Sequence, residues 1–270
     1  MPTKSTYCYW TVCTGYYAAL MEACVASARQ AGVFKEFHVF TDQPVPECIC
    51  YDAMDFNPEA GLFKLLYLKA GMAKLNFDYF VWIDADTWFV RQPRNILEIM
   101  GRSPMHLPLE LKLGDTDQSM QFNGSTASEY DMLMREAGVL NEVYFGESAF
   151  WVVHHDVIDR VYDLARNFVV KCKANGQPRT ATVGLSYAMQ MLCGNPERHL
   201  CLSHSDLWAP ARDKQFQREK PTGKPWTYHV PFTGKGEPVN PAIVHLGNRD
   251  GQNEAANVTS ESSDTNRVFA

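Results

Sequence analysis

The sequence predicts an α/β fold in which a mixed, mostly parallel central sheet is flanked by helices within a single domain. Segments typical of strands and of helices alternate through the first 100 residues with short connections, as in a sheet built with crossover helices. Hydrophobic residues make up 46% of the 270 residues and aromatic residues 12%, so the chain can bury a large core. The sequence shows no internal repeat.

The first three predicted elements are a strand, a helix and a second strand. Residues 6–14, TYCYWTVCT, are rich in aromatic and β-branched side chains and lead to Gly15, which predicts a strand followed by a turn. The segment 16–32 is Ala-rich, places small or apolar residues at helical spacing and closes at Gly32, so it predicts a helix. Residues 36–42, EFHVFTD, predict a short strand, because two proline residues follow it closely.

The later elements follow from the same reasoning. Residues 61–75 have helical spacing, and YFVWI at 79–83 predicts a buried strand. Many Pro, Gly and polar residues at 101–131 predict loops and short strands around a cleft. Further predicted elements are a helix over 155–176, a helix over 182–194 and a short strand within 241–248.

Charge and composition exclude several classes of protein. The formal net charge is −6 and lysine and arginine form no blocks, which argues against nucleic-acid binding and favours small molecules or saccharides as ligands. No segment approaches the roughly 20 apolar residues that span a bilayer, so we expect no transmembrane segment. The N-terminus has no long apolar run and the cysteines lack a zinc-site spacing, so we expect reduced thiols and a cytoplasmic protein.

Two carboxylates interrupt the apolar segment FDYFVWIDADTWFV at 77–90. Asp84 and Asp86 directly follow a predicted strand, so they lie near the carboxyl edge of the sheet, where open α/β sheets bind ligands. A D-x-D triplet alone carries little information, since about one is expected by chance in a chain of this length. The second match, Asp115-Thr-Asp117, follows no buried strand and fits a solvated loop.

The spacing of the two acids suits a cation. Side chains at i and i+2 of an extended segment point the same way, so both carboxylates can converge on one cation or divide between a cation and ligand hydroxyls. Carboxylates forced together at the end of a buried strand repel each other, and a divalent metal removes that cost. In the alternative interpretation, Asp84 and Asp86 cap a helix or pair with Arg91 and Arg94 at the surface.

The same segment resembles the D-x-D region of nucleotide-sugar glycosyltransferases with the Rossmann-like GT-A fold. It is most similar to glycosyltransferase family 8, the glycogenin-like and bacterial lipopolysaccharide transferases. The resemblance implies that Asp84, Ala85 and Asp86 bind Mn²⁺ or Mg²⁺ together with the diphosphate of a UDP-sugar. It also implies a GT-A domain over 1–250, with a nucleotide-binding half (1–100) and a sugar and acceptor half (101–250), followed by a flexible polar tail (251–270).

The resemblance further implies nucleotide contacts at the ends of the first two strands. The family's first strand ends in a Thr-containing turn, which maps onto Thr14, Gly15, Tyr16 and Tyr17, with one tyrosine stacked on uracil. Either tyrosine fits a core position at a helix start equally well. The family's second strand ends in a polar residue beside the base, which Asp42 supplies. The string FTDQP around Asp42 also resembles family 6 transferases, the blood-group type.

A basic residue and a late histidine complete the family's donor site. The basic residue lies on the helix before the D-x-D strand, which implies Lys64, with Lys69 as the competing position. The histidine completes the metal shell, which implies His245 after the apolar run PAIV. Gly247 lets the backbone approach a phosphate, and Arg249 adds a positive contact.

The second half of the chain departs from the family in places. Glu147 and Ser148 stand where the family has its sugar-contacting segment, so they are the candidates for contacts to the donor sugar or the acceptor. The family's Lys-Pro-Trp run follows the histidine, whereas here Lys224-Pro-Trp226 precedes it. The acid expected at the start of the later helix is missing from RTATVGLSYAMQ.

The resemblance implies a metal-dependent transferase that moves a hexose or related sugar from a UDP-sugar to a glycan, lipid-linked or protein-linked acceptor with retention of configuration. Glu147 is a nucleophile or a polar orienter, and front-side attack without an enzyme nucleophile is equally open. One alternative is a phosphohydrolase of the haloacid dehalogenase type with Asp84 as nucleophile. Another is a nucleotide-sugar or glycan-binding protein without turnover.

Overall fold

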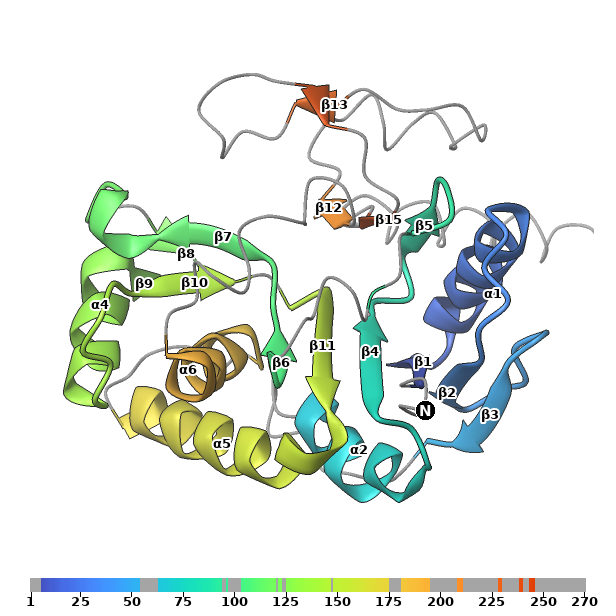
Figure 1. Cartoon of the computed structure of the whole chain (residues 1–270), viewed down its shortest axis with the longest axis horizontal. Coiled ribbons are helices and arrows are strands. Elements are labelled where there is room, and N and C mark those ends of the chain that lie inside the picture. The colour runs from blue at the N-terminus through green and yellow to red at the C-terminus, as the bar shows by residue number, and fades with distance from the viewer. Residues whose placement is uncertain are drawn as a thin grey trace, which may run out of the picture.

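Alternating hydrophobic segments of the chain pair into a central six-stranded sheet (Figure 1). Its strands are β1 (Tyr7–Val12), β2 (Phe37–Thr41), β3 (Ile49–Asp52), β4 (Tyr79–Ile83), β6 (Met105–His106) and β11 (Phe150–His154). They are hydrogen-bonded in the order β3-β2-β1-β4-β11-β6. The first four run parallel, and β11 is antiparallel to both β4 and β6. The predicted mixed, mostly parallel sheet is therefore confirmed.

The figure shows a computed structural model. It describes residues 6–53, 63–93, 96, 103–119, 121–122, 125–146, 148–174, 181–194, 208–210, 228–229, 238–239 and 243–245. The predicted polar tail lies outside these residues. In the part of the chain that is described, no helix has both the length and the apolar character needed to cross a membrane.

Helices cover both faces of the sheet because successive strand residues point to opposite sides. The helices are α1 (Tyr16–Gln30), α2 (Phe63–Ala70), α4 (Ala127–Glu136), α5 (Ile158–Ala174) and α6 (Ala181–Cys193), with 3₁₀ turns at Met72–Lys74, Leu113–Asp115 and His155–Val157. Along β1, Tyr9 faces the core under α1, whereas Trp10 faces the core under α2, α5 and α6. The domain is thus a sheet between two helical layers.

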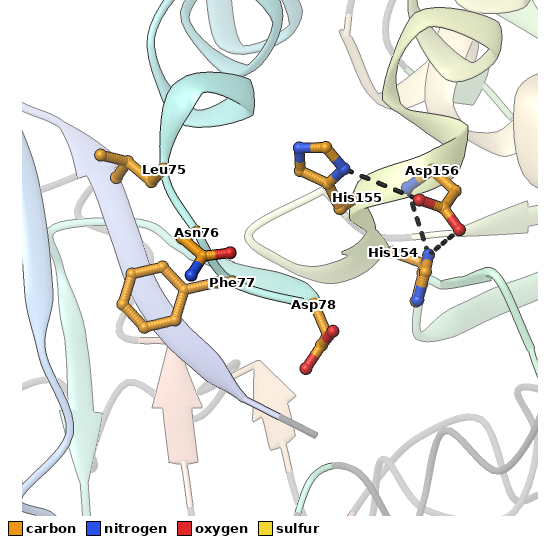
Figure 2. A pocket seen from close by; sticks show the side chains of 7 residues that line it. All are labelled: Leu75, Asn76, Phe77, Asp78, His154, His155 and Asp156. Carbon is orange, nitrogen blue, oxygen red and sulfur yellow. Dashed lines mark hydrogen bonds and ion pairs between the residues drawn. The ribbon is translucent and has the colours of Figure 1, made fainter. Parts of the chain in front are cut away.

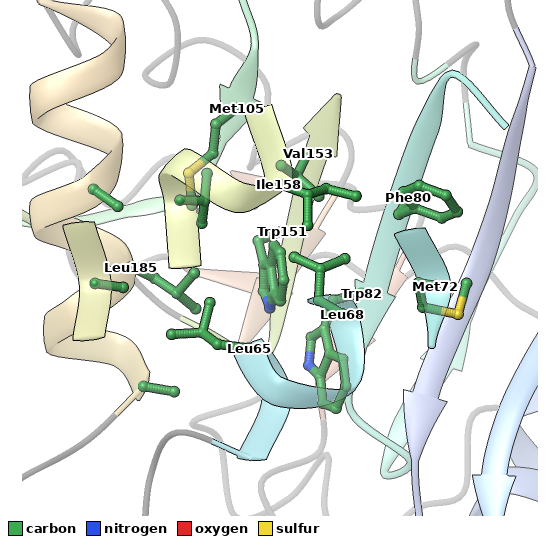
Figure 3. Packing of buried hydrophobic residues seen from close by; sticks show 14 of the residues in the cluster. Leu65, Leu68, Met72, Phe80, Trp82, Met105, Trp151, Val153, Ile158 and Leu185 are labelled. Atoms are coloured by element: carbon green, nitrogen blue, oxygen red, sulfur yellow. The ribbon is translucent and has the colours of Figure 1, made fainter. Parts of the chain in front are cut away.

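Three tryptophans form a row across the middle of the sheet. Trp10 of β1, Trp82 of β4 and Trp151 of β11 are paired in register and almost fully buried. Trp82 meets Trp10 edge to face, with ring centroids 4.6 Å apart, and stacks on Trp151 at 6.2 Å. Figure 3 shows Trp82 and Trp151 packed among the aliphatic side chains of α2 and α6. Because directly opposite rings contact each other across the strands, the row favours this register of β1, β4 and β11. Each ring also shields the next from water.

A smaller core lies beside the sheet, where α4 packs with α5, α6 and β10 (Tyr144–Gly146). Strand β10 pairs antiparallel with β7 (Leu109–Lys112). A capping box begins α4, because the Thr126 hydroxyl accepts the Glu129 N–H and the Glu129 carboxylate accepts the Thr126 N–H. The prediction of loops and short strands over 101–131 was therefore wrong at its C-terminal end.

Three short strands form a second, smaller sheet at the carboxyl edge of β4. They are β5 (Thr87–Phe89), β12 (Trp208–Pro210) and β15 (Ile243–His245), which pair in the order β12-β15-β5. The Phe89 N–H donates to the Ser27 hydroxyl at 3.0 Å, which attaches β5 to α1. Two further pairs are β8 (Gln121–Phe122) with β9 (Ser125–Thr126) and β13 (Tyr228–His229) with β14 (Pro238–Val239).

The predicted strands at 6–14, 36–42, 79–83 and within 241–248 are confirmed, as are the helices at 16–32, 155–176 and 182–194. The helix predicted over 61–75 is shorter, because α2 ends at Ala70 and the chain passes through Gly71 into a 3₁₀ turn. The seven described cysteines are free, and four of them are buried, as expected for small core residues.

Gly71 provides a test of this packing. A Cβ atom at Gly71 would overlap the ring of Phe40 and lie 3.0 Å from the Tyr67 carbonyl oxygen. The Phe40 ring is held between Tyr51 and Tyr67, at centroid distances of 5.1 and 4.9 Å, so it has little room to move. Gly71→Ala should therefore lower the free energy of unfolding by about 1–3 kcal/mol in urea denaturation. The control is Gly114→Ala, whose Cβ meets open space, and equal stability of the two variants would contradict the packing described here.

Candidate functional site

Three neighbouring parallel strands end at one edge of the sheet in residues that the sequence singled out. Strand β1 lies between β2 and β4 and leads into Thr14 and Gly15. Strand β2 leads into Asp42, and β4 leads into Asp84. Because parallel strands bring their carboxyl ends to the same edge, the predicted nucleotide and metal residues are gathered there.

Gly15 and Asp42 are directly bonded. The Gly15 N–H lies 3.0 Å from each carboxylate oxygen of Asp42, and the Gln43 side-chain amide donates to the Gly15 carbonyl at 2.8 Å. Gly15 has φ 55° and ψ −127°, a backbone conformation that residues with a Cβ atom rarely adopt. The turn between β1 and α1 therefore requires glycine, and the carboxylate of Asp42 holds it in place.

Two aromatic rings are exposed next to this turn. Tyr16 and Tyr17 begin α1 and have 42% and 47% of their surface exposed. Their ring centroids are 6.0 Å apart. The interpretation of either tyrosine as a core residue is therefore wrong, because neither side chain is buried.

Asp84 is held from both its backbone and its side chain. Its N–H donates to the Ala149 carbonyl at 2.9 Å, which fixes the end of β4 against the start of β11. Its Oδ1 accepts from the ammonium of Lys64 and from the indole N–H of Trp82, each at 2.7 Å. Lys64 also donates to the Ser148 carbonyl at 3.1 Å and lies 4.5 Å above the Trp82 ring. The sequence predicted Lys64, Asp84 and Ser148 separately, and the fold brings them together.

The second acid of the triplet lies in a turn. Ala85 and Asp86 form the turn between β4 and β5, so the alternation of an extended strand does not relate Asp86 to Asp84. The expectation that both side chains point the same way assumed an extended segment, and the turn at Ala85 and Asp86 contradicts that assumption. Asp86 is half-buried, and its negative charge adds to the burial that raises the pKa of the Cys24 thiol of α1.

The backbone of His245 lies beside this turn. His245 pairs with Thr87, the residue after Asp86, where β15 runs antiparallel to β5. Paired Cα atoms in such ladders are about 4.5–5.5 Å apart, so the end of β15 adjoins the D-x-D segment. The side chain of His245 lies outside the described part of the structure, as do Glu147, Gly247 and Arg249.

Ser148 is buried rather than open to a ligand. It is 7% exposed, and its hydroxyl lies 2.6 Å from the hydroxyl of Thr182 at the start of α6. Its described role is to offer its carbonyl to Lys64. This makes Ser148 part of the support of the site.

Trp82 is a residue of the site that the sequence did not indicate. It was predicted as part of a buried strand, and most of its ring is indeed core. The available signal was its position two residues before Asp84, since alternate residues of a strand share a face. A polar N–H on a buried ring usually has an acceptor nearby, and here the acceptor is the carboxylate.

The donor atoms fit a hard divalent cation that shares its ligands with a phosphate. Carboxylate oxygens are preferred by Mg²⁺ and Mn²⁺, and such ions often take one or two carboxylates and complete their shell with phosphate oxygens and water. Among the described side chains, no three His, Cys, Asp or Glu residues are grouped so that they could hold a metal without other ligands. Asp84 and Asp86 therefore suit a shared site better than a closed protein cage.

A separate hollow of about 350 Å³ lies at the opposite edge of the sheet, where β4 begins and β11 ends (Figure 2). Asp78, His154, His155 and Asp156 are among the residues that line it. Asp156 lies 3.6 Å from the ring of His154 and 3.7 Å from that of His155. None of the residues singled out from the sequence lines this hollow, so it is distinct from the Asp84 edge.

Comparison with known proteins gives no assignment. No protein-family model matches the chain, and no curated protein matches its sequence significantly.

The Lys64–Asp84 pair can be tested against a second pair on the same helix. The Lys64 side chain is 10% exposed and that of Asp84 27%, whereas Lys69 and Asp159 are 40% and 81% exposed. Lys64→Met keeps the aliphatic stem but removes the donor from a partly buried carboxylate, so it should lower the free energy of unfolding by about 2 kcal/mol. Lys69→Met should leave it unchanged, because solvent screens that pair. Equal effects in thermal or urea denaturation would show that the Lys64 pair is no stronger than a surface pair.

Proposed function

We propose that this protein is a metal-dependent glycosyltransferase that transfers a hexose or related sugar from a UDP-sugar to a hydroxyl of a glycan, lipid-linked or protein-linked acceptor. The observation that carries the proposal is the gathering of Gly15, Asp42 and Asp84 at one edge of a parallel sheet, with Asp86 in the next turn. Open α/β sheets bind nucleotides at this edge. The resemblance of the D-x-D segment to GT-A transferases assigns the same residues to the donor.

The Gly15 turn is suited to the nucleoside end of the donor. The two exposed tyrosines supply flat faces on which a uracil ring can stack. Asp42 is exposed, and its carboxylate also fixes the turn through the Gly15 N–H. In this proposal one tyrosine contacts the base, and Asp42 keeps the turn and the tyrosine in place.

The Asp84 turn is suited to the diphosphate end. Transfer of the sugar develops negative charge on the leaving diphosphate and oxocarbenium character at the anomeric carbon. A divalent cation held by Asp84 and Asp86, with His245 as the proposed further ligand, would stabilise that negative charge as a Lewis acid.

Lys64 acts within this proposal by fixing Asp84. Its ammonium is bonded to that carboxylate and to the Ser148 carbonyl, so its described role is to orient Asp84. The buried ammonium of Lys64 is therefore bonded to one carboxylate of the triplet. Its positive charge also offsets the repulsion between Asp84 and Asp86.

The proposal predicts that Asp86→Ala abolishes metal-dependent UDP binding. Loss of a ligand should weaken the affinity for UDP in the presence of Mn²⁺ on the order of 100-fold or more, at least as much as loss of an outer-shell partner. Asp117→Ala is the matched control, because it removes an acid from the second D-x-D triplet, where Asp117 is exposed and bonded to Ser119. Titration calorimetry measures both variants, and unchanged affinity in Asp86→Ala would falsify the proposal.

A second measurement separates the proposal from its two alternatives. Release of UDP from a panel of UDP-sugars with Mn²⁺ and candidate acceptors is expected for a transferase. Hydrolysis of a generic phosphomonoester without UDP release would indicate a phosphohydrolase with Asp84 as nucleophile. Tight UDP-sugar binding without either reaction would indicate a binding protein.

A further inference from the structure

We infer that Trp82 is a positioning residue, whose indole N–H sets the orientation of Asp84 for its ligand. This inference rests on the proposed function, because it concerns how Asp84 meets a metal and a nucleotide. The N–H of Trp82 and the ammonium of Lys64 both donate to the same oxygen, Oδ1, at 2.7 Å. Two donors on one oxygen fix the rotation of the carboxylate, and that rotation decides where its other oxygen lies.

The indole is a rigid donor. Trp82 is 1% exposed, and its ring is held by Trp10, Trp151 and Phe63 at centroid distances of 4.6, 6.2 and 6.4 Å. A ring packed on several sides cannot follow the carboxylate if the carboxylate turns away. Lys64, in contrast, has a flexible stem, and the Trp82 ring beneath its ammonium helps to restrain it.

The row of three tryptophans shows that this bond is specific to position 82. The indole N–H groups of Trp10 and Trp151 are buried without a hydrogen-bond acceptor in the described part of the structure, whereas that of Trp82 is bonded to Asp84. The three rings are otherwise alike in burial and in their place in the core. The chain thus contains its own controls for removal of an indole N–H.

The two donors also differ in charge. Lys64 neutralises Asp84, so its removal changes both the orientation and the charge of the site. The indole N–H is neutral, so its removal changes the orientation and leaves the formal charge as it was. Outer-shell hydrogen bonds to metal ligands typically change metal affinity by about 10–100-fold. A substitution at Trp82 therefore isolates the contribution of orientation.

The experiment compares Trp82→Phe with Trp151→Phe in the full chain. Phenylalanine keeps an aromatic ring over which the Lys64 ammonium can sit, and it removes the N–H. Affinity for Mn²⁺ in the presence of UDP is measured by electron paramagnetic resonance, and stability by urea denaturation. Trp82→Phe should bind Mn²⁺ about 10-fold more weakly than the wild type. Trp151→Phe should stay within about twofold of the wild type, although it also replaces a buried indole of the same core.

Several outcomes overturn the inference in distinguishable ways. If the wild type binds Mn²⁺ with UDP and Trp82→Phe binds it equally well, Trp82 does not position Asp84, while the proposed function stands. Equal losses of affinity in Trp82→Phe and Trp151→Phe would mean that the effect is general to the core. Absence of Mn²⁺ and UDP binding in the wild type would overturn the proposed function itself. If Trp82→Phe does not fold, benzothienylalanine at position 82 keeps the shape of the indole without its N–H and is measured in the same way.

Discussion

The Lys64–Asp84 ion pair is the interaction on which the arrangement of the site depends. Asp84 follows a strand whose last four residues are buried, and its carboxylate, which is 27% exposed, is stabilised by a cation that bonds to it. Lys64 supplies it from α2, and the Ser148 carbonyl holds the same ammonium from the turn before β11. One charged group therefore joins α2, β4 and the start of β11. Without it, the packing of α2 on Trp82 would still hold the end of β4, but the Asp84 carboxylate would lose the cation that orients it.

The topology of the sheet explains why the other candidate residues lie near this pair. Strand β1 is central among the parallel strands, so its turn at Gly15 has the end of β2 on one side and that of β4 on the other. The antiparallel strand β11 brings Ala149 to the backbone of Asp84. The small sheet of β5 and β15 then places His245 opposite Thr87. Short-range sequence thus supplies the chemical groups, and strand order brings them to one edge.

Strong local patterns made much of this fold predictable. The alternation of apolar strands and helical segments identified β1, α1, β2 and β4, and the apolar run before the acids placed Asp84 at a strand end. Helix α4 was missed because its polar first turn resembled a loop, although Thr126 and Glu129 carried a capping signal. Strand β11 was not predicted, since FWVV is too short to distinguish a strand from a buried helix segment. The bond from Trp82 to Asp84 and the pairing of β15 with β5 depend on side-chain rotation and long-range contacts, which local sequence does not determine.

The central claim is that a divalent cation and a nucleotide bind at the carboxyl edge of β4. Paramagnetic broadening by Mn²⁺ in the presence of UDP, measured on the amide resonances of the ¹⁵N-labelled protein, tests it most directly. Strand β4 spans about 17 Å, and paramagnetic broadening falls steeply with distance, so residues at its two ends differ in how strongly they are broadened. The account predicts much stronger broadening at Gly15, Asp42 and Asp84 than at Asp78 and His154 on the opposite edge. Broadening centred on Asp78 and His154, or no localised broadening, would contradict it.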